Sequence, residues 1–428
     1  MHSENRAYLT TKPLIENSPG TQYNSLYYRP YNFQSELVEV TANYGRNRIN
    51  LSSTGFGSTS TIYIQNVNMN GPNVLELELP TPNADVTYCR GWGLASIAQI
   101  QWATPGSQLQ QFTGKNMYQA LMGQCQTSEQ RSELLRLCGE EVLAPIPAVV
   151  GQDAPRYRAY VPIFLPWSSM CPEKLYLDTN MYTQNINITI SFNASSYFMG
   201  GTGTKPNNFV NASYSYRELI FTNPFDSIRT PMTHDRSLSE YYPYQTIMNS
   251  NVNTFQGVKE SQVLAGVNLN LQSFLDADLL GIMFYVTSQS DSISTAGNSP
   301  NPFHSVEITN VRLVYAGQTI YSTIGDEFKL INMFSWKGSN IIQGSYIQPG
   351  NTAPFISYPV ADYITYIDFA RLRQLCTEDQ FYNTFRIGNN VINLQFNTPT
   401  NDNYNVYCTY IFNSLVKSQG GMSEIQIN

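Results

Sequence analysis

The sequence predicts an all-β protein built from two tandem domains of one fold, and three observations lead to this prediction. The composition is rich in strand-forming aromatic side chains, with 30 Tyr and 21 Phe among 428 residues, of which only 13% are charged. The length suits two hydrophobic cores, because single cores stop growing at roughly 250–300 residues. The third observation is an internal repeat.

The repeat matches segments of the first half with segments of the second half in the same order. Because side chains alternate between the two faces of a strand, a repeat that keeps its register also keeps the buried face, and so indicates a shared fold. The aligned pairs are Ile97–Leu109 with Ile308–Ile320, Gly114 with Gly325, Tyr160–Pro166 with Ile364–Ala370, and Ile188–Asn193 with Ile392–Asn397.

Each half is expected to hold eight antiparallel strands. Within Val74–Leu79, leucines alternate with Glu76 and Glu78, which indicates one buried and one solvated face. The segment Lys115–Leu137 carries Met and Leu among polar residues without Pro, which predicts one or two helices, and a short helical turn is expected at Pro172–Leu177. The first-half strands are expected at 46–52, Thr61–Val67, Val74–Leu79, 94–102, 108–113, 157–165, 185–193 and 213–222, with a loop at 196–212.

The second half repeats this order, with a helix expected over Asp326–Trp336 after its fifth strand. Its long stretches 287–304 and 337–358 are expected to be functional loops. Eight antiparallel strands with helices placed in this way are typical of a jelly roll. The second-half strands are expected at 245–255, Leu264–Leu271, Leu279–Val286, Val306–Tyr315, Thr319–Ser322, Tyr363–Phe369, Asn389–Phe396 and Asn405–Phe412. The predicted domains are an N-terminal arm at 1–40, a first jelly roll at 41–223, a linker at 224–244, a second jelly roll at 245–417 and a C-terminal tail at 418–428.

Charge and cysteine usage exclude several classes of function. A net charge of −7 argues against direct nucleic-acid binding, which needs clustered Lys and Arg. Six scattered cysteines without a CxxC pair predict reduced thiols and folding in a reducing compartment. The N-terminus lacks the apolar stretch of a signal peptide, and no run approaches the ~18 apolar residues of a membrane span, so we expect neither secretion nor a membrane anchor.

Residues that could carry chemistry have simpler interpretations, and we expect no catalytic, cofactor or metal site. The three histidines have no carboxylate or cysteine at ligand spacing. The glycine-rich Gly200–Pro206 lacks the spacing of a phosphate-binding loop, and its proline removes a backbone donor. The acidic residues suit turns and solvated surface better than calcium binding or glycoside hydrolysis. The residues considered are His2, His234, His304, Asp276, Asp278, Glu140, Glu141 and Asp153.

Two groups of tyrosines are candidate contact residues. Tyr gives a large contact area at a low entropic cost, which suits anchors between subunits, and ordinary packing between the two halves is the alternative. The candidates are Tyr27, Tyr28 and Tyr31 in the arm, and Tyr241, Tyr242 and Tyr244 before the second half.

Taken together, several motifs resemble the double jelly-roll major capsid proteins of double-stranded DNA viruses, the lineage of adenovirus hexon, tailless phages, virophages and nucleocytoplasmic large DNA viruses. In the first half these are Tyr160–Trp167, Leu175–Leu177 and Ile186–Phe192. In the second half they are Tyr363–Phe369 and the ending from Tyr404 to Gly421. The resemblance covers roughly 45–421, and the order and duplication of the motifs make it specific.

The resemblance implies a structural protein that is not an enzyme. Three chains would form a homotrimer whose six jelly rolls make a pseudo-hexagonal tile of an icosahedral shell in the virion, after synthesis in the host cytoplasm or nucleus. Its expected partners are itself, neighbouring capsomers, and penton and minor capsid proteins, with an internal membrane or its proteins as a further contact for the arm. The alternative is a viral spike or lectin-like β-sandwich that binds carbohydrate or a receptor, which explains the composition but not the matched helices.

Overall fold

The architecture is that of a computed structural model of the whole chain. It describes residues 42–65, 67–83, 85–104, 107–124, 128–142, 157–163, 176–178, 184–221, 240–249, 253–256, 265–269, 277–288, 302–303, 305–306, 308–315, 318–322, 341–345, 359–363, 365–368, 386–387, 392–398, 401–419 and 422–427.

The first half folds into two main antiparallel sheets. One sheet has the order β1 (Ala42–Asn50), β11 (Asn211–Phe221), β3 (Asn68–Leu79) and β7 (Tyr157–Ile163), with β8 (Tyr176–Asp178) also paired to β3. The other has the order β2 (Thr59–Ile64), β9 (Ile186–Phe192), β5 (Ile97–Thr104) and β6 (Ser107–Phe112). A small sheet pairs β4 (Val86–Tyr88) with β10 (Met199–Gly201). The helices are α4 (Trp92–Ala95), α5 (Gly114–Gln124), α6 (Ser128–Leu137) and the 3-10 turn η3 (Ser195–Tyr197).

The second half repeats this arrangement. One sheet has the order β12 (Glu240–Asn249), β23 (Asn403–Gln419), β15 (Ala277–Ser288) and β20 (Thr365–Asp368). The strands β13 (Asn253–Gln256) and β24 (Met422–Ile427) also pair with β23, and β21 (Arg386–Ile387) pairs with β15. The other sheet has the order β14 (Ala265–Leu269), β22 (Ile392–Asn397), β16 (Thr309–Tyr315) and β17 (Gln318–Ser322). A separate hairpin joins β18 (Ile341–Ser345) to β19 (Pro359–Tyr363).

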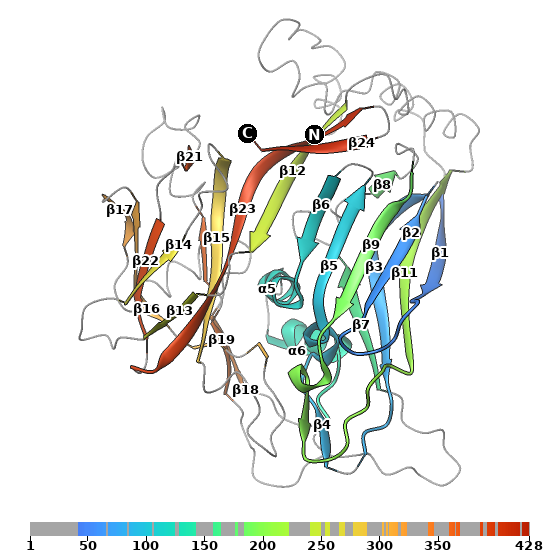
Figure 1. Ribbon diagram of the computed structural model, residues 1–428, viewed down its shortest axis with the longest axis horizontal. Coiled ribbons are helices and arrows are strands. Elements are labelled where there is room, and N and C mark those ends of the chain that lie inside the picture. The colour runs from blue at the N-terminus through green and yellow to red at the C-terminus, as the bar shows by residue number, and fades with distance from the viewer. Residues whose placement is uncertain are drawn as a thin grey trace, which may run out of the picture.

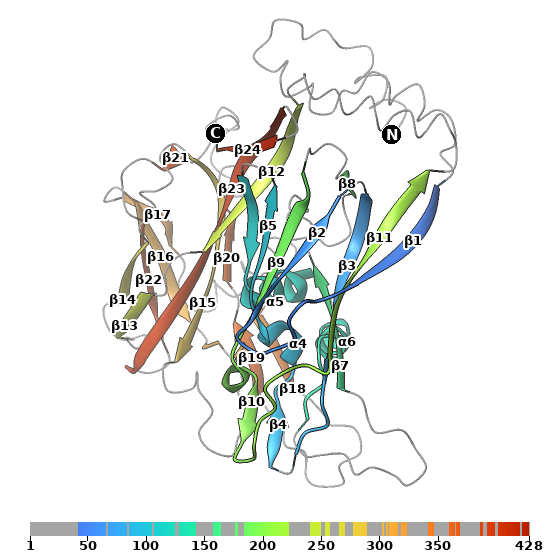
Figure 2. The ribbon, with the colours of Figure 1, turned by 45° about the vertical axis from the view of Figure 1, so that its right-hand side comes forward.

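Both halves have the strand order of an eight-stranded jelly roll. With strands lettered B to I along the chain, β1, β2, β3, β5, β6, β7, β9 and β11 form the sheets B-I-D-G and C-H-E-F. The strands β12, β14, β15, β16, β17, β20, β22 and β23 form the same two sheets in the second half. The two rolls lie side by side, with the helices α4, α5 and α6 at the lower middle of the molecule (Figures 1 and 2). The predicted fold class of two tandem jelly rolls is confirmed.

The internal repeat is visible in the pairing of individual residues. In the β5–β6 hairpin the register shifts between Trp102 and Ala103, and in the β16–β17 hairpin it shifts between Leu313 and Val314, the positions that the sequence aligns. The pairing of β9 with β5 and of β22 with β16 shows that the sequence alignment of β9 with β22 is displaced. Trp102 lies opposite Ile188 and Leu313 opposite Leu394, so the structural counterpart of Ile188 is two residues beyond Ile392. A pattern that alternates apolar and polar residues can be aligned with a copy shifted by two residues. Such a shift leaves the same side chains on the buried face but pairs the wrong residues across the strands.

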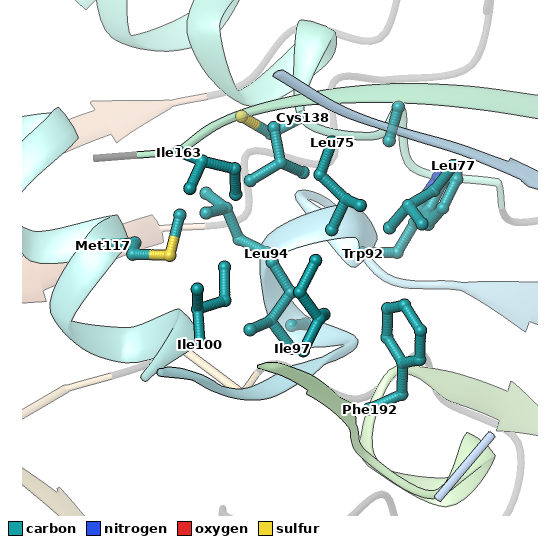
Figure 3. Packing of buried hydrophobic residues seen from close by; sticks show 14 of the residues in the cluster. Leu75, Leu77, Trp92, Leu94, Ile97, Ile100, Met117, Cys138, Ile163 and Phe192 are labelled. Atoms are coloured by element: carbon teal, nitrogen blue, oxygen red, sulfur yellow. The ribbon is translucent and has the colours of Figure 1, made fainter. Parts of the chain in front are cut away.

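The core of the first roll fills the space between its sheets and extends onto α4. Trp92 and Leu94 of this helix lie between leucines of β3 and isoleucines of β5 (Figure 3). Close approach requires glycine at one position: a Cβ on Gly93 would lie 2.5 Å from the carbonyl oxygen of Cys138 and 2.7 Å from Cβ of Ala159. The helix is thereby fixed tightly against β7.

Four expectations differ from the observed elements. The expected loop 196–212 contains β10, where Gly201 has a φ of 87° and a Cβ would collide with the carbonyl of Asp85. Residues 240–244, expected in the linker, begin β12, and the expected tail 418–428 contains the end of β23 and β24. Residues 176–177, expected in a helical turn, belong to β8. The strands β8, β10 and β12 form by long-range pairing, which local composition does not report, whereas β24 forms a hairpin with the end of β23. The expected helix Asp326–Trp336 lies outside the described residues.

Candidate functional site

The candidate functional site is the surface through which one jelly roll binds another, here called the seam. On the first roll the seam is formed by β5, β6 and the start of α5, and on the second roll by β12, β15, β23 and β24. The seam therefore joins the C-H-E-F side of the first roll to the outer face of the B-I-D-G sheet of the second.

The strand β15 is buried on both of its faces. Residues 281–287 are all buried, and successive side chains of a strand point to opposite faces. Phe284 faces its own roll, where its ring centroid lies 6.4 Å from that of Phe396. Met283, on the opposite face, belongs to the apolar cluster of the first roll, as does Ile411 of β23. Side chains on the outer face of the second roll thus extend the hydrophobic core of the first roll across the seam.

A buried hydrogen bond and an aromatic stack connect the rolls. Nδ2 of Asn116 donates to Oγ1 of Thr409 at 2.7 Å, and both residues are buried. The rings of Tyr118 and Phe303 stack with centroids 4.1 Å apart and an angle of 9° between their planes. Asn116 is also fixed from its own side, because its Oδ1 accepts from the backbone N–H of Thr113 at 3.1 Å. This reciprocal cap starts α5 and orients the amide toward the second roll.

Lys115 places a cation among aromatic rings at the seam. Its Nζ lies 4.1 Å from the ring centroid of Tyr407, 5.2 Å from that of Tyr285 and 5.9 Å from that of Tyr197. The rings of Tyr285 and Tyr407 are themselves stacked at 4.8 Å. Such contacts between a cation and ring faces are attractive, most of all where water is excluded. Burial lowers the pKa of Lys115 to about 8 and raises the pKa of all three phenols.

The outer face of the first roll's B-I-D-G sheet has a different character, because it is charged. Nη2 of Arg48 lies 3.3 Å from Oε2 of Glu76, and Nε of Arg158 lies 3.5 Å from Oε2 of Glu78. Tyr160, with 40% of its surface exposed, lies beside them in a hollow of this face. The equivalent face of the second roll is apolar and buried in the seam, so the two copies of this face have diverged.

The tyrosines expected as contact residues are only partly covered by the structure. Tyr27, Tyr28 and Tyr31 lie outside the described residues. Tyr241, Tyr242 and Tyr244 belong to β12, opposite Lys417, Val416 and Ser414 of β23, and their side chains are outside the described part. Their role stays a prediction. The backbone pairing places these three residues in the B-I-D-G sheet that forms the seam.

The residues weighed as chemical sites show no catalytic arrangement in the described part. Burial raises the pKa of Glu141, an effect that the charge of Arg90 opposes. Asp278 pairs through its backbone with Asn413 and Arg386 within the sheet. Among the described residues, no group of three or more His, Cys, Asp or Glu is placed to hold a metal ion, and no helix is long and apolar enough to cross a membrane. His2, His234, His304, Asp153 and Asp276 lie outside the described residues.

The strand order of both halves defines a double jelly-roll fold, and comparison with solved structures shows that viral capsid proteins share this fold. The chain is similar to the PBCV-1 virus capsid (11% identity, 90% of this chain and 97% of that chain, TM-score 0.56). It is also similar to the Sputnik virophage structure (10%, 91% and 90%, TM-score 0.57) and to the Faustovirus major capsid protein (10%, 89% and 91%, TM-score 0.56). No family model and no curated protein sequence matches.

The seam was not found from the sequence, although one signal points to it. The first-roll strand D alternates as Val74–Leu79, whereas its counterpart in the second roll reads Leu279–Val286, an almost unbroken apolar run. An unbroken run is typical of a strand buried on both faces, and an alternating one of a strand with one solvated face. No comparable pattern identifies Lys115 or Asn116, because their partners on the second roll, Tyr285, Tyr407 and Thr409, are far away in sequence.

Proposed function

We propose that the chain is the major capsid protein of an icosahedral double-stranded DNA virus and acts as a structural subunit of its shell. The observation that carries the proposal is the packing of two jelly rolls of the same strand order side by side through dissimilar faces. The fold shared with viral capsid proteins supports it. The protein is then a component of the virion, made in the host cytoplasm or nucleus, and does no catalysis.

The seam suggests how three copies close into a ring. Within the chain, the B-I-D-G face of the second roll covers the C-H-E-F side of the first roll. Repeating the same relation between chains puts the B-I-D-G face of one first roll against the C-H-E-F side of a neighbour's second roll. Such a contact joins unlike surfaces, and contacts of this kind form a ring when the rotation closes. Three chains supply six rolls, which gives a homotrimer with a pseudo-hexagonal outline.

The charged face of the first roll is the subunit contact in this arrangement. Arg48, Glu76, Glu78 and Arg158 are already paired within the chain, so a neighbour meets few unpaired charges. Tyr160, which lines the hollow, is 40% exposed, and tyrosine is the kind of residue that dominates binding energy in interfaces. Contacts with neighbouring capsomers, penton and minor capsid proteins, and an internal membrane or its proteins belong to the remaining surfaces of the trimer.

Light scattering on the purified protein tests both the capsid function and the face assigned to the subunit contact. The capsid function predicts a particle of about three times the chain mass of 48.3 kDa. A monodisperse monomer that binds glycans would contradict it and favour the spike or lectin alternative. The variant Tyr160→Glu is expected to yield a folded monomer, whereas Leu137→Glu, an equally exposed site on α6, is expected to remain trimeric. A trimeric Tyr160→Glu protein would refute the assigned face while leaving the capsid function intact.

A further inference from the structure

The seam contains a cavity that the packing of the two rolls leaves open. Its volume is about 280 Å³, and its walls come from both rolls. Leu94, Ala95, Ile97, Tyr285 and Phe303 give it a largely apolar lining. A dry apolar cavity of about 150 Å³ suffices for benzene, so this one has room for a body of roughly ten non-hydrogen atoms. Small-molecule sites have this character, an apolar lining with a few placed polar groups.

The polar group in this cavity is the ammonium of Lys115. In the part of the chain that the structure describes, it contacts the faces of three tyrosine rings and no carboxylate. Ring faces replace only part of the hydration that a cation loses on burial, as the lowered pKa of Lys115 reflects. A carboxylate is the partner that fully compensates such a cation, through a charge-assisted hydrogen bond.

The surrounding backbone also favours an anion. Thr113, Gly114, Lys115 and Asn116 line the cavity at the first turn of α5, an 11-residue helix whose N-terminal end carries a partial positive charge. Burial raises the pKa of each of the three phenols, so they are neutral at pH 7 and add no negative charge to compete with an anion. The electrostatics favour an anionic group and the lining favours an apolar body, so the cavity suits an anion that carries an apolar part.

We propose that this cavity binds a small monocarboxylate with an apolar body, with the carboxylate on Nζ of Lys115 and the apolar part between the two jelly rolls. The bound molecule contacts α5 of the first roll together with β15 and β23 of the second. It therefore stabilises the two rolls in their joined arrangement, because a ligand that binds only the folded state raises the stability of that state. The proposal does not depend on the capsid function.

Isothermal titration calorimetry at pH 7 with 4-phenylbutanoate and its neutral amide, 4-phenylbutanamide, tests the site. The native protein is expected to bind the carboxylate at least tenfold more tightly than the amide. Lys115→Met, which keeps most of the stem, is expected to remove this tenfold preference, and the matched control Lys205→Met, on the loop after β10, is expected to keep it. At pH 9.5, where Lys115 is mostly neutral, the native protein is expected to lose the preference as well.

A second variant keeps the test valid if Lys115→Met folds poorly. Ala98 lines the cavity and is the extra residue where the β5–β9 register shifts between Ile97 and Gln99. Ala98→Leu fills the cavity without a change of charge and is expected to abolish binding of both compounds. Equal affinity for acid and amide in the native protein, unchanged binding to Ala98→Leu, or no saturable heat with the native protein would each overturn the proposal.

Discussion

The buried hydrogen bond between Asn116 and Thr409 gives a direct test of the seam. Replacing Thr409 by Val removes the hydroxyl and keeps the shape and the strand preference of the side chain. The Nδ2 group of Asn116 then loses an acceptor at 2.7 Å in a site where both residues are only 3% exposed. Loss of one partner of a buried hydrogen bond costs about 1–3 kcal/mol, so the free energy of unfolding should fall by that amount.

Equilibrium unfolding in urea measures this change. Protein concentration is held constant across variants, because the stability of an oligomer depends on it. The control is Thr254→Val, whose hydroxyl donates to Oδ1 of Asn405 at 3.0 Å on the exposed surface, and which should change stability by less than about 0.5 kcal/mol. The double variant Asn116→Ala with Thr409→Val should be more stable than the sum of the single effects predicts, by 0.5 kcal/mol or more. Additive effects, or a Thr409→Val protein as stable as the native one, would refute a seam held by this bond.

Three further predictions concern the core, the seam and the thiols. Gly93→Ala should lower the free energy of unfolding by about 1–3 kcal/mol, because its Cβ would overlap Cys138 and Ala159. Gly55→Ala should be nearly neutral, because its Cβ would make only ordinary van der Waals contacts, the nearest with Ser58 at 3.7 Å; equal urea midpoints of the two variants would contradict this. The pKa of Lys115 is lower in the folded protein than in the unfolded chain, so the unfolded chain holds the proton more tightly between about pH 8 and 10.4. Over this range the free energy of unfolding of the native protein, relative to that of Lys115→Met, should rise by up to about 3 kcal/mol. A difference between the two proteins that does not change with pH would show that the amine is not buried. Burial raises the pKa of the Cys89 thiol, and Cys138 and Cys408 are also buried, so these thiols should react with a disulfide reagent only when the protein unfolds, as mass spectrometry of labelled peptides would show.

Alternation and duplication carried most of the fold prediction. Leu75, Leu77 and Leu79 are buried as their spacing predicts, while Glu76 and Glu78 form ion pairs on the outer face. The helical pattern between the fifth and sixth strands of the first half corresponds to α5 and α6. These features are local, so periodicity in the sequence reports them directly.

Elements that depend on distant partners were missed or shifted. The first five residues of β12, 240–244, include Pro243 and three tyrosines and look like a linker. They are nevertheless a strand, because β23 offers β12 a ladder from Asn249 to Glu240. The two-residue error in the alignment of β22 has the same origin, because only the neighbouring strands β14 and β16 fix its register.

The candidate site shows the same division. The continuous apolar run of β15 indicates burial on both faces, but it was not used to predict the seam. The convergence of Lys115, Tyr285 and Tyr407 depends on how two domains pack, and neither domain's sequence encodes that arrangement by itself.

Electron microscopy of the purified oligomer tests the central claim most directly. Class averages viewed down the main symmetry axis should show three-fold symmetry with six similar densities around a ring, one for each jelly roll. A three-fold particle with that outline would support a capsomer built by repeating the seam between chains. A two-fold dimer, or single two-lobed particles at concentrations well above those of the light-scattering experiment, would contradict the account.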